Sequence, residues 1–274
     1  MKKILVPTDF SDHAHQALLY AAKIAKVTKA EIVVVHAYHF LSADPLFSQS
    51  MYETAIDNMA KQAQSIMNEY AKRVADLIEV PCFFETKMGL AADVIIAEFQ
   101  AKRADIVIMG TRGANGVLGN VLGSVTSAVI ERHTVPVLAV PTSNIGNFNT
   151  IVFGTDYTEI RNPETLRPML DLAKSFGSHI HILNASFVPG HEDLDYAGEE
   201  QLERLFENLK ICFDYTCEED VEKALLDCMK QDSASLLVMI AHDRGFLKGL
   251  FHFSKTRSMA LHGDVPLLVL PELY

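Results

Sequence analysis

The chain of 274 residues has room for two domains of ordinary size, and its 49% hydrophobic and 22% charged residues are the balance of a globular protein. A net charge of −11 excludes nonspecific binding to nucleic acid or to an acidic membrane surface, because phosphates attract a basic face. No apolar run approaches the ~18 residues of a membrane-spanning helix, and the run after Lys3 is too short for a signal peptide, so we expect a cytoplasmic protein.

The first half alternates short apolar strands with helical patterns. Strands are predicted at residues 3–7, 31–37, 80–86, 104–109 and 136–141, and helices at 12–26, 50–77, 90–101 and 124–132. Ser11 or Asp12 is the expected cap of the first helix. The strands are apolar over nearly their whole length, as in sheets that are buried on both faces. Alternation with helices therefore predicts right-handed βαβ units and a parallel sheet.

The same pattern then repeats in the second half of the chain. The matched segments are residues 4–10 with 151–157, 31–37 with 179–185, 82–86 with 212–216, and 136–141 with 266–271. Residues 142–149 between the halves are polar and contain a glycine, as linkers do. The sequence therefore predicts two copies of one α/β domain, at residues 1–142 and 150–274.

A glycine-punctuated loop follows the strand at 104–109. Gly110, Gly113 and Gly123 let backbone N–H groups approach a ligand, and Ser124 and Thr126 add hydroxyl groups where the next helix begins. Backbone donors at the positive end of a helix are typical of phosphate-binding sites. The loop is therefore a candidate cradle for a phosphate group.

The motifs resemble those of the universal stress protein (UspA-like) superfamily in its tandem two-domain form. They are Pro7-Thr8-Asp9-Phe10-Ser11, Val35-His36-Ala37, Gly110-x2-Gly113-x9-Gly123-Ser124, and the Val-Pro-Val-Leu-x-Val-Pro strand at 135–141. The resemblance covers essentially the whole chain. It implies two tandem doubly wound domains, each a five-stranded parallel sheet of order 3-2-1-4-5 with helices on both faces. In such sheets ligands bind at the carboxyl ends of strands one and four, which Asp9 and Gly110 follow.

The resemblance also implies an adenine nucleotide site in the first domain, for ATP or for AMP or ADP, with Mg²⁺ on the phosphates. Asp9 matches the aspartate that contacts the adenosine, and Ala37 matches a backbone group that meets the adenine. The loop glycines approach the ribose and phosphates, and residues 123–126 donate to the phosphate chain. The implied binding residues are Thr8, Asp9, Ala37, Met109, Gly110, Arg112, Gly113, Gly123, Ser124, Val125 and Thr126.

Each of these positions also has a purely structural interpretation. Asp9 and Ser124 are possible helix caps, Gly110 and Gly113 are suited to a turn, and Arg112 is suited to a solvated surface. The sequence alone leaves both interpretations open.

The second domain departs from the motif. Ile240, Asp243 and Phe253 stand where the three glycines are expected, while Asp156 keeps the position of Asp9. A carboxylate repels phosphate, and a phenyl ring fills the space that a close backbone approach needs. We therefore expect one ATP per chain, in the first domain.

Neither histidine nor cysteine spacing predicts a metal site. His242, His252 and His262 are ten residues apart, but the predicted elements place them on a strand end, a loop and a helix end, and His179 and His181 lie elsewhere. The cysteines, Cys82, Cys212, Cys217 and Cys228, show no CxxC spacing. We interpret them as reduced, small, buried side chains.

Three functions fit the sequence. The first is a cytoplasmic, regulatory stress-response protein that binds ATP in its N-terminal domain. The second is an adenine-nucleotide enzyme, at most a slow ATPase, because no residue stands out as a general base and no Walker-type lysine loop is present. The third is a nucleotide-free interaction scaffold.

The fifth strand of each domain is an apolar edge that needs covering. We predict that residues 137–140 and 267–270 pair within one chain, which produces an internal pseudo-dimer. Association of two chains into a homodimer is left open.

Overall fold

The computed structural model describes residues 1–39, 49–111, 123–141, 148–155, 160–184, 196–215, 221–241 and 266–272. Its strands are β1 (Lys3–Pro7), β2 (Glu31–Tyr38), β3 (Cys82–Met88), β4 (Ile106–Gly110), β5 (Val137–Val140), β6 (Thr150–Thr155), β7 (His179–Asn184), β8 (Lys210–Tyr215), β9 (Leu236–Ala241) and β10 (Leu267–Pro271). Its α-helices are α1 (Asp12–Thr28), α2 (Gln49–Val74), α3 (Ala91–Lys102), α4 (Ser124–Ile130), α5 (Arg167–Phe176), α6 (Tyr196–Leu205) and α7 (Val221–Gln231). Short 3₁₀ turns, η1 (Ala75–Leu77) and η2 (Pro163–Leu166), follow α2 and precede α5.

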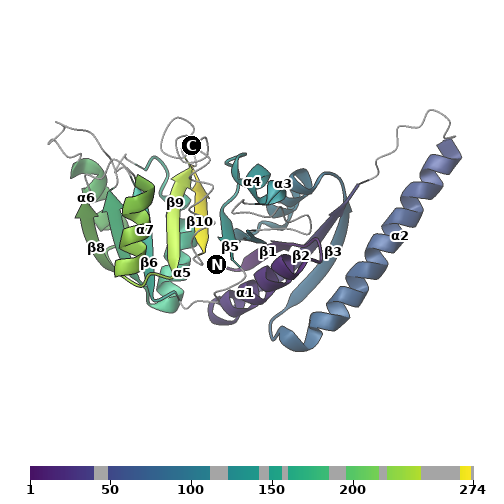
Figure 1. The fold of residues 1–274 in the computed structure, drawn as a ribbon, viewed down its shortest axis with the longest axis horizontal. Helices are drawn as coiled ribbons and strands as arrows, with labels where there is room; N and C mark the ends of the chain where they lie inside the picture. Colours follow the sequence, from purple (N-terminus) through teal and green to yellow (C-terminus); the bar gives the residue numbers. More distant parts are fainter. Residues whose placement is uncertain are drawn as a thin grey trace.

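All ten strands form one continuous sheet in the order β3-β2-β1-β4-β5-β10-β9-β6-β7-β8 (Figure 1). Within each half the neighbouring strands run parallel, and each half has the order 3-2-1-4-5. The same pairings recur in the second half. The predicted fold of two tandem doubly wound domains is therefore confirmed.

The two halves join through β5 and β10, which pair antiparallel. Leu267 lies opposite Ala139, and Leu268 lies opposite Leu138. Because Leu138 and Leu268 are equivalent positions of the repeat, the local two-fold axis passes between them. The predicted pairing of the fifth strands within one chain is confirmed.

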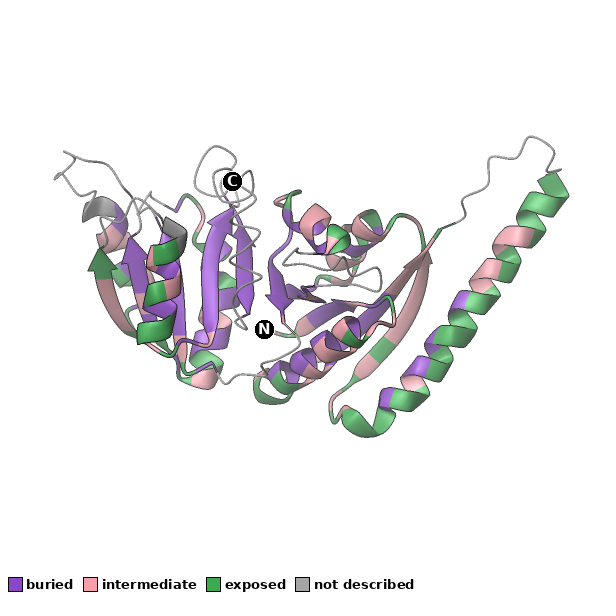
Figure 2. Ribbon diagram, viewed as in Figure 1, coloured by how far each residue is buried: buried purple, intermediate pink, exposed green. Residues whose placement is uncertain are grey.

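Helices cover both faces of the sheet and bury two hydrophobic clusters that extend through both domains. One cluster lies under α1, α2, α5 and α6, and the other lies under α3, α4 and α7. Figure 2 shows most of the sheet as buried, whereas the outer side of α2 is exposed. None of the described helices combines the length and hydrophobicity that crossing a membrane requires.

The register of the outer strands corrects one detail of the repeat. Val33 pairs with Phe83 in the first domain, and the equivalent His181 pairs with Cys212 in the second. Cys212 is therefore equivalent to Phe83, and the predicted match of Cys212 to Cys82 is wrong by one residue. A shift of one residue moves a side chain to the opposite face of the sheet.

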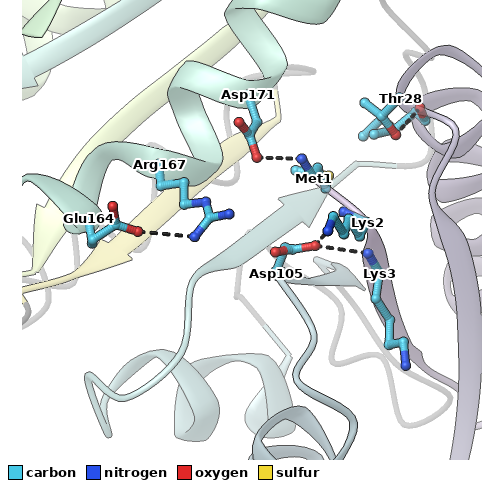
Figure 3. Close-up of polar contacts among 9 residues, drawn as sticks. Met1, Lys2, Lys3, Thr28, Asp105, Glu164, Arg167 and Asp171 are labelled. Carbon is cyan, nitrogen blue, oxygen red and sulfur yellow. Dashed lines mark hydrogen bonds and ion pairs between the residues drawn. The ribbon is translucent and has the colours of Figure 1, made fainter.

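Asp105, the residue directly before β4, binds the start of the neighbouring strand β1 through hydrogen bonds. Its Oδ2 accepts hydrogen bonds from the backbone N–H groups of Lys2 (2.5 Å) and Lys3 (2.8 Å). Nearby, the terminal amine of Met1 reaches Asp171 on α5 of the second domain, 2.5 Å away (Figure 3). Hydrogen bonds that involve charged groups thus hold the amino-terminal ends of β1 and β4 in place.

Asp105→Ala is expected to lower the free energy of unfolding by about 1–2 kcal/mol, because two N–H groups lose a charged acceptor that is only partly exposed. Urea unfolding followed by circular dichroism measures the change. The matched control is Asp76→Ala, which removes an exposed aspartate in η1 and is expected to cost less than about 0.5 kcal/mol. Equal effects of the two substitutions would contradict the role given to Asp105.

Candidate functional site

The carboxyl ends of β1 and β2 are tied together by Thr8. The N–H of Thr8 donates to the carbonyl of Val35 (2.9 Å), and Nδ1–H of His36 donates to the carbonyl of Thr8 (2.8 Å). Thr8 itself is buried, with 6% of its surface exposed. The position of the residue that follows, Asp9, is therefore fixed relative to the end of β2, where Ala37 lies.

Asp9 is exposed and organises the start of α1. Its Oδ1 accepts hydrogen bonds from the backbone N–H (3.1 Å) and the hydroxyl (2.5 Å) of Ser11. Ser11 is the N-cap of α1, because its hydroxyl accepts from the N–H of Ala14 (3.3 Å). Of the two predicted caps, the structure selects Ser11 over Asp12. Asp9 supports this cap and stands at the surface beside the strand ends.

Phe10 is a residue of this site that the sequence did not reveal. It has a φ of +63°, which is unusual for a bulky side chain and indicates local strain. Its ring packs on His36, with 4.5 Å between centroids, and against Tyr70 of α2 at 5.4 Å. Burial raises the pKa of Tyr70 to about 12. The aromatic cluster holds the turn that carries Asp9, a function that the motif containing Phe10 did not indicate.

Gly110 ends β4 beside the start of α1. A Cβ atom at this position would lie 2.9 Å from the carbonyl oxygen of His13 and 3.0 Å from its carbonyl carbon. Glycine is therefore required here by the close packing of α1 on the strand end, whatever the ligand. β1 and β4 are neighbouring parallel strands, with Leu5 opposite Val107, so Thr8 and Gly110 both lie at the carboxyl ends of these strands.

The ends of the glycine loop meet at its base. The N–H of Gly123 donates to the carbonyl of Thr111 (2.7 Å), and the N–H of Thr111 donates to Val140 of β5 (3.0 Å). The hydroxyl of Thr126 donates to the carbonyl of Gly110 (3.0 Å). The segment between, residues 112–122, lies outside the described residues, and with it lie the predicted site residues Arg112 and Gly113.

The start of α4 presents backbone donors next to this closed base. The first hydrogen bond within the helix runs from the N–H of Ser127 to the carbonyl of Gly123. The N–H groups of Ser124, Val125 and Thr126 therefore belong to the first turn, where a helix offers them no internal acceptor. Ser124 and Val125 are exposed at this turn.

Thr126 and Met109 have structural functions that the sequence did not indicate, and the backbone of Gly123 does not require glycine. Thr126 is buried, and its hydroxyl hydrogen is used by Gly110, so it closes the loop base instead of pointing to solvent. Met109 is 5% exposed and packs in the core under α3 and α4. Gly123 has a φ of −53°, which residues other than glycine also adopt.

The equivalent place in the second domain is filled. Ile240, which stands at the position of Gly110, is 4% exposed and packs in the core under α5 and α6. The other altered positions, Asp243 and Phe253, lie outside the described residues, as do Asp156 and the histidines His242, His252 and His262. In the second domain, the buried side chain of Ile240 thus takes the place that stays free of a side chain at Gly110, where α1 packs closely on β4 in the first domain.

Comparison with known proteins identifies relatives of the first half of the chain. The sequence model of the Universal stress protein family matches residues 1–141. Universal stress protein MJ0531 of Methanocaldococcus jannaschii is 31% identical over 139 residues, which are 51% of this chain and 81% of that protein. A universal stress protein in complex with cAMP has a solved structure that covers 52% of this chain and 98% of its own, with 24% identity and a TM-score of 0.40.

A crystal structure extends the similarity of fold to both domains. The universal stress protein from Archaeoglobus fulgidus DSM 4304 covers 99% of this chain and 98% of its own, with a TM-score of 0.73 and 20% identity. The first half thus matches the family in sequence, and both halves share its fold. The chain belongs to the universal stress protein family, as a tandem of two such domains in a single sheet.

Proposed function

We propose that the first domain binds an adenine nucleotide, ATP, at the carboxyl ends of β1, β2 and β4. The chain would act as a cytoplasmic, regulatory stress-response protein. The proposed contacts come from Thr8, Asp9, Ala37, Met109, Gly110, Arg112, Gly113, Gly123, Ser124, Val125 and Thr126. Family membership and the convergence of these strand ends at the switch point of the sheet support the assignment.

The observation that carries the proposal is the closed base of the glycine loop beside the first turn of α4. The hydrogen bond between Gly123 and Thr111 fixes the turn relative to β4, so that the N–H groups of Ser124 and Val125 are positioned before a ligand arrives. Because α4 has only seven residues, we attribute phosphate binding to these individual N–H groups and to the Ser124 hydroxyl more than to a long helix dipole. Mg²⁺ would enter with the phosphates of ATP.

The adenosine would lie across β1 and β2. Asp9 is held by Ser11 at the surface beside the strand ends, which leaves its carboxylate well placed for a ribose hydroxyl. The backbone at Ala37 offers hydrogen bonds to the adenine edge, and Thr8 and Met109 contribute backbone. Thr126 would act indirectly, through the carbonyl of Gly110.

We also propose one nucleotide per chain, with domain boundaries at residues 1–142 and 150–274. The buried Ile240 supports a second domain without this nucleotide site. A homodimer of two chains would add a further level of assembly.

Ser124→Asp tests the phosphate contact. A carboxylate in the first turn of a helix is favourable for the helix, but it repels a phosphate only a few ångströms away. We expect the Kd for ATP to rise more than about tenfold, which corresponds to about 1.4 kcal/mol, while the affinity for adenosine and the thermal stability stay unchanged. Isothermal titration calorimetry with ATP, AMP and adenosine measures these affinities.

The matched control is Ser50→Asp, which adds the same charge to the first turn of a different helix, α2. It is expected to leave all three affinities within about twofold. The proposal fails if the natural chain shows no ATP binding below about 1 mM, or if Ser124→Asp binds ATP as tightly as the natural chain.

A further inference from the structure

A second cluster of chemically active side chains lies near the outer edge of the second domain. His181 on β7 faces α7. Cys228 lies on the side of α7 that covers the sheet, and Asp232 follows one helical turn later, directly after the end of α7 at Gln231. One nitrogen, one sulfur and one carboxylate oxygen from these residues all lie within 4.8 Å of one another. In Figure 1, α7 crosses in front of this part of the sheet.

The spacing of these atoms suits a tetrahedral metal ion. Sγ of Cys228 lies 3.5 Å from Nδ1 of His181 and 3.8 Å from Oδ2 of Asp232. Bond lengths of about 2.3 Å to sulfur and about 2.0–2.1 Å to nitrogen place the two ligand atoms about 3.5 Å apart around tetrahedral zinc. His181 and Asp232 are at present joined by a hydrogen bond from Nδ1–H to Oδ2, which a metal ion would replace.

The imidazole ring of His181 lies between two carboxylates. Asp214 on β8 lies 3.7 Å from Nε2 of His181, and Asp232 binds the other ring nitrogen. Nε2 is buried and has no hydrogen-bond partner among the described residues. Cys228 is buried, with 7% of its surface exposed. Two carboxylates and a buried thiol thus surround one imidazole ring.

In the first domain, a lysine neutralises the acidic residue that is equivalent to Asp214. The turns after α3 and α7 make identical backbone hydrogen bonds, from Ala104 to Phe99 and from Ala234 to Met229. This match makes Lys102 the equivalent of Asp232.

The strand register makes Glu85 the equivalent of Asp214. In the first domain Lys102 forms an ion pair with Glu85 and lowers the pKa of that carboxyl group, and Lys87 also pairs with Glu85 at 3.3 Å. In the second domain an acid, Asp232, stands at the position of Lys102, so the lysine of the first domain is replaced by a residue of opposite charge.

We propose that His181, Cys228 and Asp232 bind a zinc ion in the second domain. A thiolate, an imidazole and a carboxylate together favour Zn²⁺ over Mg²⁺ or Ca²⁺, which prefer oxygen ligands. The ion supplies the charge that Lys102 supplies in the first domain. Water would fill the fourth coordination position, and the largely exposed Asp214 of β8 lies near the other ring nitrogen, Nε2. This site is separate from the nucleotide site and does not depend on it.

The test uses the full chain without a histidine tag, stripped of metal with a chelator and then titrated with Zn²⁺ against a chromophoric competitor. We expect one zinc ion per chain with a Kd below about 1 μM. Co²⁺ in the same site should give the near-ultraviolet charge-transfer absorption of a cobalt–thiolate bond.

Two variants separate a metal site from an incidental cluster. Asp232→Lys restores the arrangement of the first domain, so the chain should stay folded with a lysine–Asp214 ion pair while zinc affinity falls more than about 100-fold. Cys228→Ala, a small-to-smaller change in the core, should abolish the cobalt–thiolate absorption.

His179→Ala is the matched control, because it removes an exposed histidine two residues before His181 on the same strand. It should leave the affinity for zinc and the cobalt spectrum unchanged. The proposal is overturned if the natural chain binds no zinc below about 1 μM, or if the natural chain, Asp232→Lys and Cys228→Ala all bind it equally.

Discussion

Leu268→Asp is expected to lower the free energy of unfolding by more than about 4 kcal/mol and to expose the junction of the two domains. Leu268 is fully buried in β10, opposite the equally buried Leu138 of β5. A carboxylate at this position has no cation opposite it and must either lose its hydration or break the strand pairing. Urea unfolding followed by circular dichroism measures the loss of stability, and size-exclusion chromatography reports association through the uncovered strand.

The control for this substitution is Leu77→Asp, since Leu77 is 53% exposed in η1. It is expected to change the free energy of unfolding by less than about 0.5 kcal/mol and to leave the elution volume unchanged. If Leu268→Asp cost less than about 1 kcal/mol, the pairing of β5 with β10 would not be a main source of stability.

Gly110→Val is expected to cost about 3 kcal/mol of stability and, in the fraction that stays folded, to weaken ATP binding more than tenfold. The added Cβ would meet the backbone of His13 at 2.9 Å, and backbone atoms cannot rotate away as the tip of a side chain can. The start of α1 must therefore move, and with it the turn that carries Asp9. Thermal unfolding and calorimetry with ATP give the two quantities.

Gly177→Ala separates this collision from the general cost of replacing a glycine. Gly177 has a φ of +65° at the end of α5, and a Cβ there would meet nothing within 4 Å. We expect a loss of about 1 kcal/mol from backbone strain alone, with ATP affinity unchanged. A Gly110→Val protein that is as stable and binds ATP as tightly as Gly177→Ala would show that α1 adjusts freely to the added side chain.

The parallel direction of the strands was predictable from the sequence, because apolar runs of strand length alternate with amphipathic helices. Their order, 3-2-1-4-5, was implied by the resemblance to the family and not by this alternation. The limits of the elements were less predictable: the third strand is Cys82–Met88 instead of 80–86, and α4 ends at Ile130 instead of residue 132. Hydrophobicity changes little across these boundaries, whereas hydrogen bonds with the neighbouring strand decide where pairing stops.

The register of β8 was missed for a different reason. Matching Cys212 to Cys82 by residue type assigns it to the wrong face of the sheet, away from α7. The true register sets Cys212 beside His181, on the face that also receives Cys228. Residue identity is a poor guide to register, because the packing of each face decides it. The cluster of His181, Cys228 and Asp232, drawn from β7 and from the end of α7, therefore had no signature in the sequence.

At the candidate nucleotide site the topology predicted more than the side chains did. β1 and β4 are neighbours at the point where the strand order reverses, and this alone predicted that Asp9 and Gly110 lie at one edge of the sheet. The collision that fixes Gly110, the positive φ of Phe10 and the buried hydroxyl of Thr126 depend on contacts between distant segments. No local pattern encodes such contacts.

The strand pairing at Leu138 and Leu268 joins two domains of one chain, and the sequences of these domains can change independently of each other. In an assembly of two identical chains, every substitution appears twice, so a ligand site cannot be lost from one copy and kept in the other. Here both halves are encoded separately while the strand pairing that unites them is preserved. One half can keep its glycines and its lysine–glutamate pair while the other acquires Ile240 and Asp232. Covalent fusion thus turns a symmetric assembly into one whose two ends can perform different chemistry.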